Sequence, residues 1–263
     1  MRRLVPNAFA LALAAAAMPA FAEPVATPVS YTAGDTTLAG YVVHDPAQGA
    51  SQPGLVMVPN WMGVTDSALE KARGFAAQGY VVFVADMYGE GVRPANAEEA
   101  GAAAGAVYAD RPGMRARINA ALDTLRAQAG STPLDVERVG AIGFCFGGAT
   151  VLELARSGAD VDGVVSFHGN LSTSLPAEAG AVKAPVLALN GADDEYVPAQ
   201  QIADFQAEMT AAGADWQFVN FAGAVHCFAE ADANAGPMCQ YHERSAKRAY
   251  VMMDAFFDEA FAD

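Results

Sequence analysis

The chain has few residues of the types that bind metal ions or nucleic acid. Its 263 residues include three cysteines and four histidines, and none of them fall into the Cys/His spacing of a metal site. Basic residues are also scarce, because 15 lysines and arginines stand against 30 acids and the formal net charge is −15. Such a surface repels the phosphates of nucleic acids and anionic membranes. We therefore expect no metal, no cofactor and no nucleic-acid partner, and we attribute the acids to solubility.

The apolar run at the N-terminus is too short to cross a membrane. Residues 8–18 fall below the roughly 20 residues that a bilayer requires. The run follows Arg2 and Arg3 and precedes the small-x-small sequence Ala20-Phe21-Ala22. A basic start, an apolar stretch and such a cleavage site are the pattern of a secretory signal peptide. We interpret residues 1–22 as this leader, which predicts a periplasmic or secreted protein.

The rest of the chain, residues 23–263, has no visible repeat or domain boundary and would carry a charge of −17 without Arg2 and Arg3. We expect it to fold as one domain and to be a monomer without membrane contact.

Strand-like apolar runs alternate with helix-like segments along this domain. Strands are expected in a hairpin at residues 29–43 and at 54–59, 81–85, 139–142, 161–167, 186–189 and 216–220. Helices are expected from Thr65 or Asp66 to 78 and at 100–107, 114–129, 149–155, 199–212 and 241–261, the second of these as a tightly packed helix of small residues. Such alternation predicts an α/β fold, with a mostly parallel sheet and helices on both faces.

The most informative segment is Gly143-Phe144-Cys145-Phe146-Gly147-Gly148, which lies between an expected strand and an expected helix. A strand, a sharp glycine-flanked turn and a helix form the context of a nucleophile elbow, with cysteine in place of the usual serine. A thiol at the positive end of the helix is favoured as the reactive thiolate. The alternative is a buried structural cysteine in a glycine-rich turn.

A cysteine nucleophile needs a base and an acid that orients the base. Asp193 and Asp194 follow the expected strand at 186–189, and His226 follows the last expected strand. The order Cys, Asp, His along the chain is that of the α/β-hydrolase fold.

These segments resemble the dienelactone hydrolase family, a branch of the α/β-hydrolases with a Cys-Asp-His triad. The resemblance covers about residues 29–257 and is carried by segments 79–88, 143–148, 194–198 and 223–228. It implies that Cys145 is the nucleophile and His226 the base. Because the family's acid lies four residues before the proline of its loop, the resemblance selects Asp194 over Asp193.

The elbow geometry also predicts where an oxyanion would be bound. One donor is the backbone N–H of Phe146, directly after the nucleophile. The resemblance places the second donor in segment 59–63, where Trp61 N–H is our candidate. As side chains, Trp61 and Met62 are expected to be pocket wall.

Two positions depart from the family pattern. Asn60 stands where the family has a glutamate that helps to deprotonate the thiol, and an amide cannot take that proton. Activation would then fall on His226, or the thiol would rest more protonated. Glu230 stands where the family has an arginine that binds the substrate carboxylate. Glu230 either faces the pocket and repels carboxylates or points to solvent; Arg93 and Arg111 flank the region expected to hold a second arginine.

Three further residues leave alternatives open. Cys227 and Cys239 are separated by turn residues in an exported chain, so they are either a disulfide or two free thiols. His168 ends an expected strand and is either a pocket residue or a hydrogen-bonded structural histidine.

The sequence therefore predicts an exported hydrolase that cleaves an ester or lactone through an acyl-enzyme on Cys145. A thioester hydrolase or acyltransferase could use the same site. A non-catalytic binding protein that keeps the fold is the third hypothesis, because a fold does not fix a function.

Overall fold

A computed structural model of the protein describes residues 23–262. The expected leader, residues 1–22, lies outside this part of the chain. No helix among the described residues is long and apolar enough to cross a membrane.

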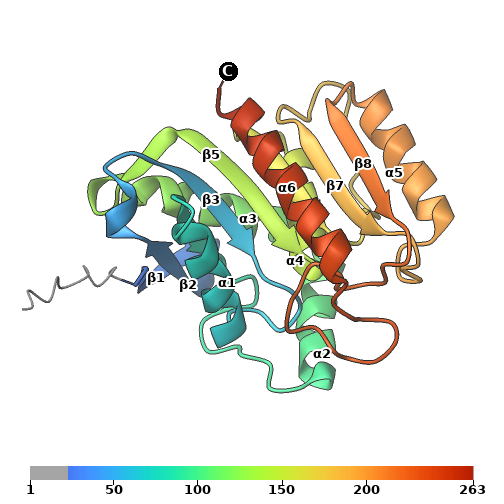
Figure 1. Cartoon of the computed structure of the whole chain (residues 1–263), viewed down its shortest axis with the longest axis horizontal. Coiled ribbons are helices and arrows are strands. Elements are labelled where there is room, and N and C mark those ends of the chain that lie inside the picture. The colour runs from blue at the N-terminus through green and yellow to red at the C-terminus, as the bar shows by residue number, and fades with distance from the viewer. Residues whose placement is uncertain (1–22, 263) are drawn as a thin grey trace, which may run out of the picture.

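The described residues build one eight-stranded sheet with the strand order β1-β2-β4-β3-β5-β6-β7-β8 (Figure 1). Its strands are β1 (Val25–Ala33), β2 (Thr36–His44), β3 (Gln52–Val58), β4 (Val81–Val84), β5 (Leu134–Phe144), β6 (Gly163–Phe167), β7 (Val186–Gly191) and β8 (Trp216–Phe221). The hairpin β1-β2 turns at Gly34, where φ is +56°, and β2 pairs antiparallel with β4. All other neighbours are parallel. The predicted fold class is confirmed.

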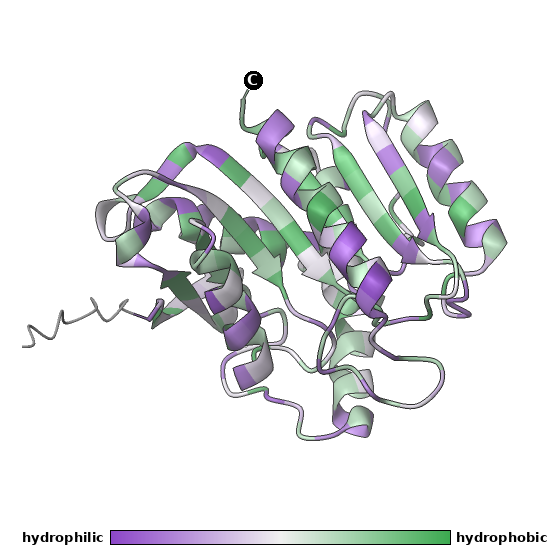
Figure 2. Ribbon diagram, in the orientation of Figure 1, coloured by the Kyte–Doolittle hydropathy of each residue, from purple (hydrophilic) through white to green (hydrophobic). Residues whose placement is uncertain are grey.

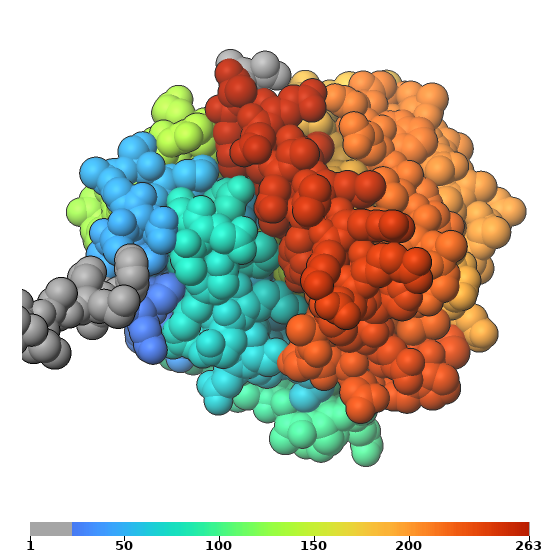
Figure 3. All heavy atoms as spheres, in the orientation of Figure 1, coloured from blue at the N-terminus to red at the C-terminus, as the bar shows by residue number. Residues whose placement is uncertain are grey.

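Helices cover both faces of the sheet. One face carries α1 (Asp66–Ala76) and α6 (Glu243–Ala260), which lie side by side in Figures 1 and 3. The other carries α3 (Arg111–Arg126), α4 (Phe146–Arg156) and α5 (Ala199–Ala211), with α2 (Ala97–Ala109) beyond the edge. Short 3-10 turns occupy Pro46–Gln48 and Ala127–Gly130. Central strands are hydrophobic while helices alternate hydrophobic and hydrophilic residues, as Figure 2 shows, because strands covered on both faces bury every side chain.

Local chemistry explains several boundaries. Thr65 caps α1 by accepting a hydrogen bond from Ala68 N–H at 3.2 Å, so it, and not Asp66, is the cap. Strand β5 begins five residues before the expected run at 139, because the charged residues Asp135, Glu137 and Arg138 interrupt the hydrophobic pattern by which a strand is recognised. The helix expected at 100–107 exists, but it is tightly packed only along Ala100, Ala104 and Val107.

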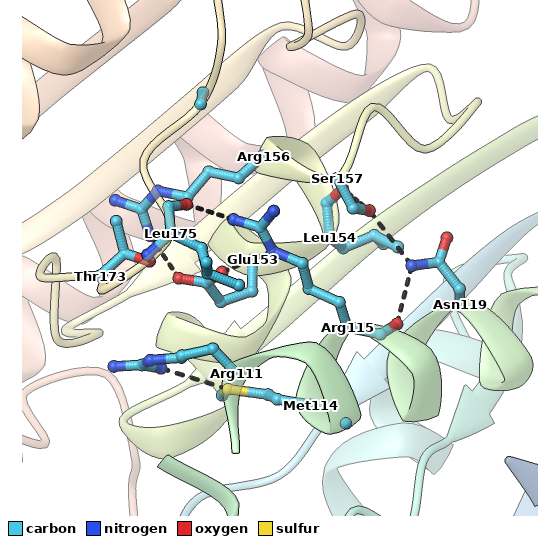
Figure 4. Close-up of polar contacts among 12 residues, drawn as sticks. Arg111, Met114, Arg115, Asn119, Glu153, Leu154, Arg156, Ser157, Thr173 and Leu175 are labelled. Atoms are coloured by element: carbon cyan, nitrogen blue, oxygen red, sulfur yellow. Dashed lines mark hydrogen bonds and ion pairs between the residues drawn. The ribbon is translucent and has the colours of Figure 1, made fainter. Parts of the chain in front are cut away.

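A buried ionic cluster fixes the segment that follows β6. Glu153 of α4 is fully buried and accepts hydrogen bonds from Arg115 Nε at 2.8 Å and Arg156 Nη1 at 3.1 Å (Figure 4). Arg156 also pairs with Glu208 at 2.9 Å and donates to the carbonyl of Leu171 at 2.7 Å. Buried charges are tolerated only when paired in this way. The cluster thus holds the chain just beyond His168 against α4.

The parallel strands all end at the same edge of the sheet, where α/β proteins build their sites. The loops after β3, β5, β6, β7 and β8 carry Trp61, Cys145, His168, Asp194 and His226, respectively.

Candidate active site

Cys145 occupies a strained turn between β5 and α4. Its φ of 54° and ψ of −115° lie outside the ordinary regions, and strain of this kind gathers at functional sites. A Cβ on Gly143 would come within 2.1 Å of the carbonyl oxygen of Gly147, and one on Gly147 within 2.0 Å of that of Val58. Only glycine therefore fits at these two positions. The thiol is free and partly exposed at the N-terminus of α4.

His226 and Asp194 form a buried pair. His226 Nδ1 lies 2.7 Å from Asp194 Oδ2, and the residues are 9% and 5% exposed. The second oxygen of Asp194 accepts the N–H of Tyr196 at 2.9 Å, which fixes the carboxylate. Asp193 is exposed. Of the two neighbouring aspartates, the structure brings only Asp194 to the histidine.

The charge state of His226 follows from its neighbours. Burial alone would lower the pKa of the imidazole, but the hydrogen bonds and charges of Asp194 and Cys145 outweigh burial and raise that pKa to about 10. At neutral pH the imidazole therefore carries its second proton. An imidazolium between a carboxylate and a thiol is suited to stabilise a thiolate.

The two predicted oxyanion donors are both free. Neither the Phe146 N–H nor the Trp61 N–H donates a backbone hydrogen bond within residues 23–262. The loop that carries Trp61 is fixed on both sides: Tyr88 OH donates to the Trp61 carbonyl at 2.7 Å, and Met62 N–H donates to Asn60 Oδ1 at 3.0 Å. Trp61 as a residue is 39% exposed.

Asn60 and Glu230 are not placed as the sequence led us to expect. Asn60 Nδ2 donates to Glu230 at 2.7 Å and Asn60 Oδ1 accepts the Met62 N–H at 3.0 Å, so both ends of the amide have partners other than the thiol. Glu230 is only 2% exposed and pairs with Lys71 Nζ at 2.7 Å, so it does not point to solvent. Because Lys71 neutralises it, Glu230 does not present an open negative charge to a substrate either.

These groups enclose a very small space. The cavity lined by Asn60, Lys71 and Glu230 measures about 10 Å³, which is room for one water molecule and not for a substrate. Asn60 and Glu230 therefore have room to contact each other and Lys71, but not a substrate.

His168 is a structural histidine and not a pocket residue. It is fully buried, its φ is +40°, and its Nδ1 accepts the backbone N–H of Cys145 at 3.1 Å. Burial, followed by the charges of His226 and Lys71, holds the pKa of this imidazole well below its usual range. His168 is therefore neutral, with its proton on Nε2.

A disulfide borders the candidate base. Cys227, directly after His226, is bonded to Cys239, which resolves the alternative that the sequence left open. The segment around Cys239 pairs with His226 in an isolated β-bridge, and Gln240 N–H donates to the His226 carbonyl at 3.1 Å. Cys227 has a φ of +63°, so the backbone turns sharply behind the imidazole.

Three tyrosines near the site were not among the site residues predicted from the sequence. Tyr196 meets His226 edge to face at 5.2 Å between ring centroids, while Tyr88 and Tyr108 each pack on Phe146 at 5.3 Å. Burial raises the pKa of both Tyr88 and Tyr108, so their phenols remain proton donors. Tyr88 could have been singled out because it closely follows a strand at the edge where the site lies. Tyr108, in the middle of an alanine-rich helix, gave no signal.

A second hollow has Tyr88 among its lining residues. A pocket of about 200 Å³ lies between α2 and α3 and is lined in part by Tyr88, Val107 and Arg117. Neither flanking arginine completes an anion clamp there. Arg93 pairs with Asp86 at 3.4 Å, and Arg111 stacks on the Tyr108 ring at 4.7 Å.

Within residues 23–262 no group of three or more His, Cys, Asp or Glu side chains could hold a metal ion. The described residues place a thiol near an imidazole that a carboxylate holds, with two N–H groups without backbone partners, and these are the groups that nucleophilic acyl transfer needs.

Comparison with known proteins shows the family of this chain. The model of the Dienelactone hydrolase family matches residues 38–261. The chain belongs to the dienelactone hydrolase family. The family resemblance read from the segments around Cys145, Asp194 and His226 is thereby confirmed, and the protein is a hydrolase of this family.

Individual relatives support the assignment. The solved structure of m3DLH is 36% identical, with a TM-score of 0.83 over 91% of this chain and 100% of its own. A dienelactone hydrolase-like promiscuous phosphotriesterase, P91 from metagenomic libraries, is 34% identical with a TM-score of 0.82 over 91% of this chain and 99% of its own. A Salmonella typhimurium protein named "Putative carboxymethylenebutenolidase" is 27% identical and covers 82% of this chain and 81% of its own.

Proposed function

We propose that this dienelactone hydrolase family protein is an exported enzyme that cleaves a neutral ester or lactone through an acyl-enzyme on Cys145. One observation carries the proposal. A hydrogen-bonded His226–Asp194 pair adjoins a strained cysteine at a helix N-terminus, and the contacts of His226 with both groups raise its pKa to about 10 against the effect of burial.

In the first half-reaction the Cys145 thiolate attacks the carbonyl carbon, and the oxygen becomes an oxyanion. The backbone N–H groups of Phe146 and Trp61 stabilise this charge, and one good donor contributes on the order of 3 kcal/mol. The bond from carbon to the leaving oxygen then breaks, and His226 Nε2 donates its proton to the departing alkoxide. Asp194 holds the other ring nitrogen throughout.

In the second half-reaction a water attacks the thioester while His226 takes its proton. The tetrahedral intermediate expels the Cys145 thiolate, the acid product leaves, and the imidazolium is restored. With a lactone, the alcohol stays attached to the acyl group and leaves as part of one hydroxy acid.

Export fits two features of the chain. Residues 1–22 have the pattern of a leader. The bond between Cys227 and Cys239 is of a kind that forms and persists in oxidising compartments. Mass determination of the mature protein from the periplasm or medium tests this part, with cleavage after Ala22 expected.

The decisive experiment compares wild type with Cys145→Ala on aryl esters and lactones. We expect the variant to stay folded and to lose turnover by at least a thousandfold, and His226→Ala to be nearly as severe, because members of a catalytic unit act together. Wild-type turnover in Cys145→Ala would make the cysteine structural and end the proposal.

Two other classes belong in the same screen. A thioester can enter the same cycle, and P91 is called a promiscuous phosphotriesterase, so an aryl phosphotriester is a second test substrate. Absence of turnover on every class, together with slow iodoacetamide labelling of Cys145, would favour a non-catalytic binding protein.

A further inference from the structure

The buried carboxylate of Glu230 joins the two segments that carry the free N–H donors. Its Oε2 accepts hydrogen bonds from Lys71 Nζ and Asn60 Nδ2, both at 2.7 Å. Its Oε1 lies 3.9 Å from His168 Nε2. At 3% side-chain exposure this charge would be costly without such partners.

The first connection runs through Asn60 to Trp61. An ionised carboxylate only accepts hydrogen bonds, so the Asn60 amide must direct its NH₂ toward Glu230. Its oxygen is then forced to face the chain, where it accepts Met62 N–H at 3.0 Å. Gly63 N–H also donates to the Asn60 carbonyl at 2.9 Å, so the turn closes around Trp61. Glu230 thereby determines which way the Asn60 amide points and the shape of the turn that presents Trp61 N–H.

The second connection runs through His168 to the elbow. The Cys145 N–H is shared between the Phe167 carbonyl at 3.0 Å and His168 Nδ1 at 3.1 Å, so the neutral imidazole accepts at Nδ1 and carries its proton on Nε2. That nitrogen is buried and has no hydrogen-bond partner among the described residues, and Glu230 Oε1 is the anion that faces it. A negative charge at this place favours the tautomer in which Nδ1 accepts the Cys145 N–H beside the Phe167 carbonyl. The next N–H along the chain is that of Phe146.

Lys71 completes the arrangement. Its ammonium group pairs with Glu230 and lies 3.9 Å from the centre of the Phe144 ring. Phe144 is the residue directly before Cys145 in the elbow. The residues of this arrangement come from four segments, which are α1 (Lys71), the loop after β3 (Asn60), the loop after β6 (His168) and the loop after β8 (Glu230).

We propose that Glu230 is a positioning residue that holds both oxyanion donors, Trp61 N–H through Asn60 and Phe146 N–H through His168. This rests on the proposed acyl-enzyme function and adds how its oxyanion site is kept in place. Glu230 does not touch the substrate, and it does not act on the sulfur.

The test uses two reactions of the same cysteine. Ester hydrolysis passes through an oxyanion, whereas alkylation by iodoacetamide displaces iodide at a saturated carbon and forms none. Donor geometry should therefore affect the first reaction and not the second. Loss of one donor outright lowers kcat by roughly 10²–10³ fold in known acyl-transfer enzymes, so a displaced donor should lose part of that.

For Glu230→Gln we expect kcat on an aryl ester to fall about 10-fold to 100-fold, with KM changed less than about threefold and the rate of Cys145 alkylation changed less than about twofold. The matched control is Asp232→Asn, which removes the charge of an exposed acid in the same loop. Asp232 accepts a hydrogen bond from Ser67, which lies on α1 as Lys71 does. The control should keep wild-type kcat.

Asn60→Ala provides a second variant in case Glu230→Gln folds poorly, because it breaks one connection without disturbing the ion pair. It should also lower kcat while sparing alkylation, and the double variant should lose less than the product of the two single losses.

Wild-type kcat in a folded Glu230→Gln protein would overturn the inference. Equal losses of hydrolysis and alkylation would also overturn it, because Glu230 would then act on the thiol. Failure of the proposed function would appear differently, as ester turnover that survives Cys145→Ala.

Discussion

Removal of the disulfide beside His226 tests whether the loop after β8 holds the imidazole in place. The perturbation is the double variant Cys227→Ala with Cys239→Ala, which leaves Cys145 as the only thiol and so prevents exchange with it. Alanine fits the buried Cys227 position and keeps a Cβ on the same positive-φ backbone, so the local backbone strain stays comparable.

The size of the effect follows from loop closure. A bond that spans a sequence separation of 12 stabilises the folded protein by about 3 kcal/mol in the chain-entropy account. For a domain of this size each kcal/mol shifts Tm by roughly 2–4 °C, so Tm should fall by about 10 °C. Activity is then measured well below the lower Tm, where both proteins are folded.

At that temperature we expect kcat to fall about 3-fold to 10-fold with little change in KM, since the segment that donates Gln240 N–H to the His226 carbonyl loses its covalent anchor. Asn234→Ala, an exposed change in the same loop, should alter neither Tm nor kcat. An unchanged Tm in the double variant would refute the loop-closure argument. A lowered Tm with wild-type kcat would show that Asp194 alone positions His226.

Three further predictions concern charge. Against the effect of burial, Asp194 and Cys145 raise the pKa of His226 from 6.5 to about 10. The charged imidazole therefore stabilises the folded protein fully below about pH 6.5, and this stabilisation is lost as pH rises through about 10. Asp194→Asn should flatten the fall of Tm over that range, and parallel Tm profiles of wild type and variant would contradict this. Asn60→Glu should lower the stability of the fold, because it places a second carboxylate against Glu230. The pH profile of Cys145 alkylation in this variant should still show one ionisation. A second ionisation would mean that position 60 reaches the sulfur. Because Glu230 is paired with Lys71, only the long-range net charge of the protein should give neutral esters a higher kcat/KM than carboxylate-bearing analogues. This preference should therefore shrink at high salt. A preference for the carboxylate compound that persists at high salt would reveal a cationic pocket.

The elbow and the order of the candidate triad could be predicted from the sequence because each depends on a short segment with a strict local requirement. Gly143 and Gly147 are needed for backbone contact, and Asp194 and His226 each follow a strand with a clear apolar pattern. The choice between Asp193 and Asp194 needed the family pattern, and the burial of Asp194 agrees with it.

The support behind the elbow could not be predicted in the same way. Lys71, Glu230 and His168 come from segments up to 159 positions apart, and no local pattern signals their contact. A buried glutamate looks like a surface glutamate in sequence, and only the fold reveals its partners. For the same reason the alternative that Glu230 points to solvent was wrong, and the small cavity that Glu230 lines has no room for a substrate.

The claim that Cys145 carries the acyl group is tested most directly by rapid quenching and mass spectrometry. Mature protein is mixed with a p-nitrophenyl ester, quenched in acid within the first turnover and digested. We expect a burst of one nitrophenolate per protein molecule and an acyl group on the peptide that contains Cys145, both absent in Cys145→Ala. Turnover without an adduct on that peptide, or an adduct on another residue that persists in Cys145→Ala, would contradict it.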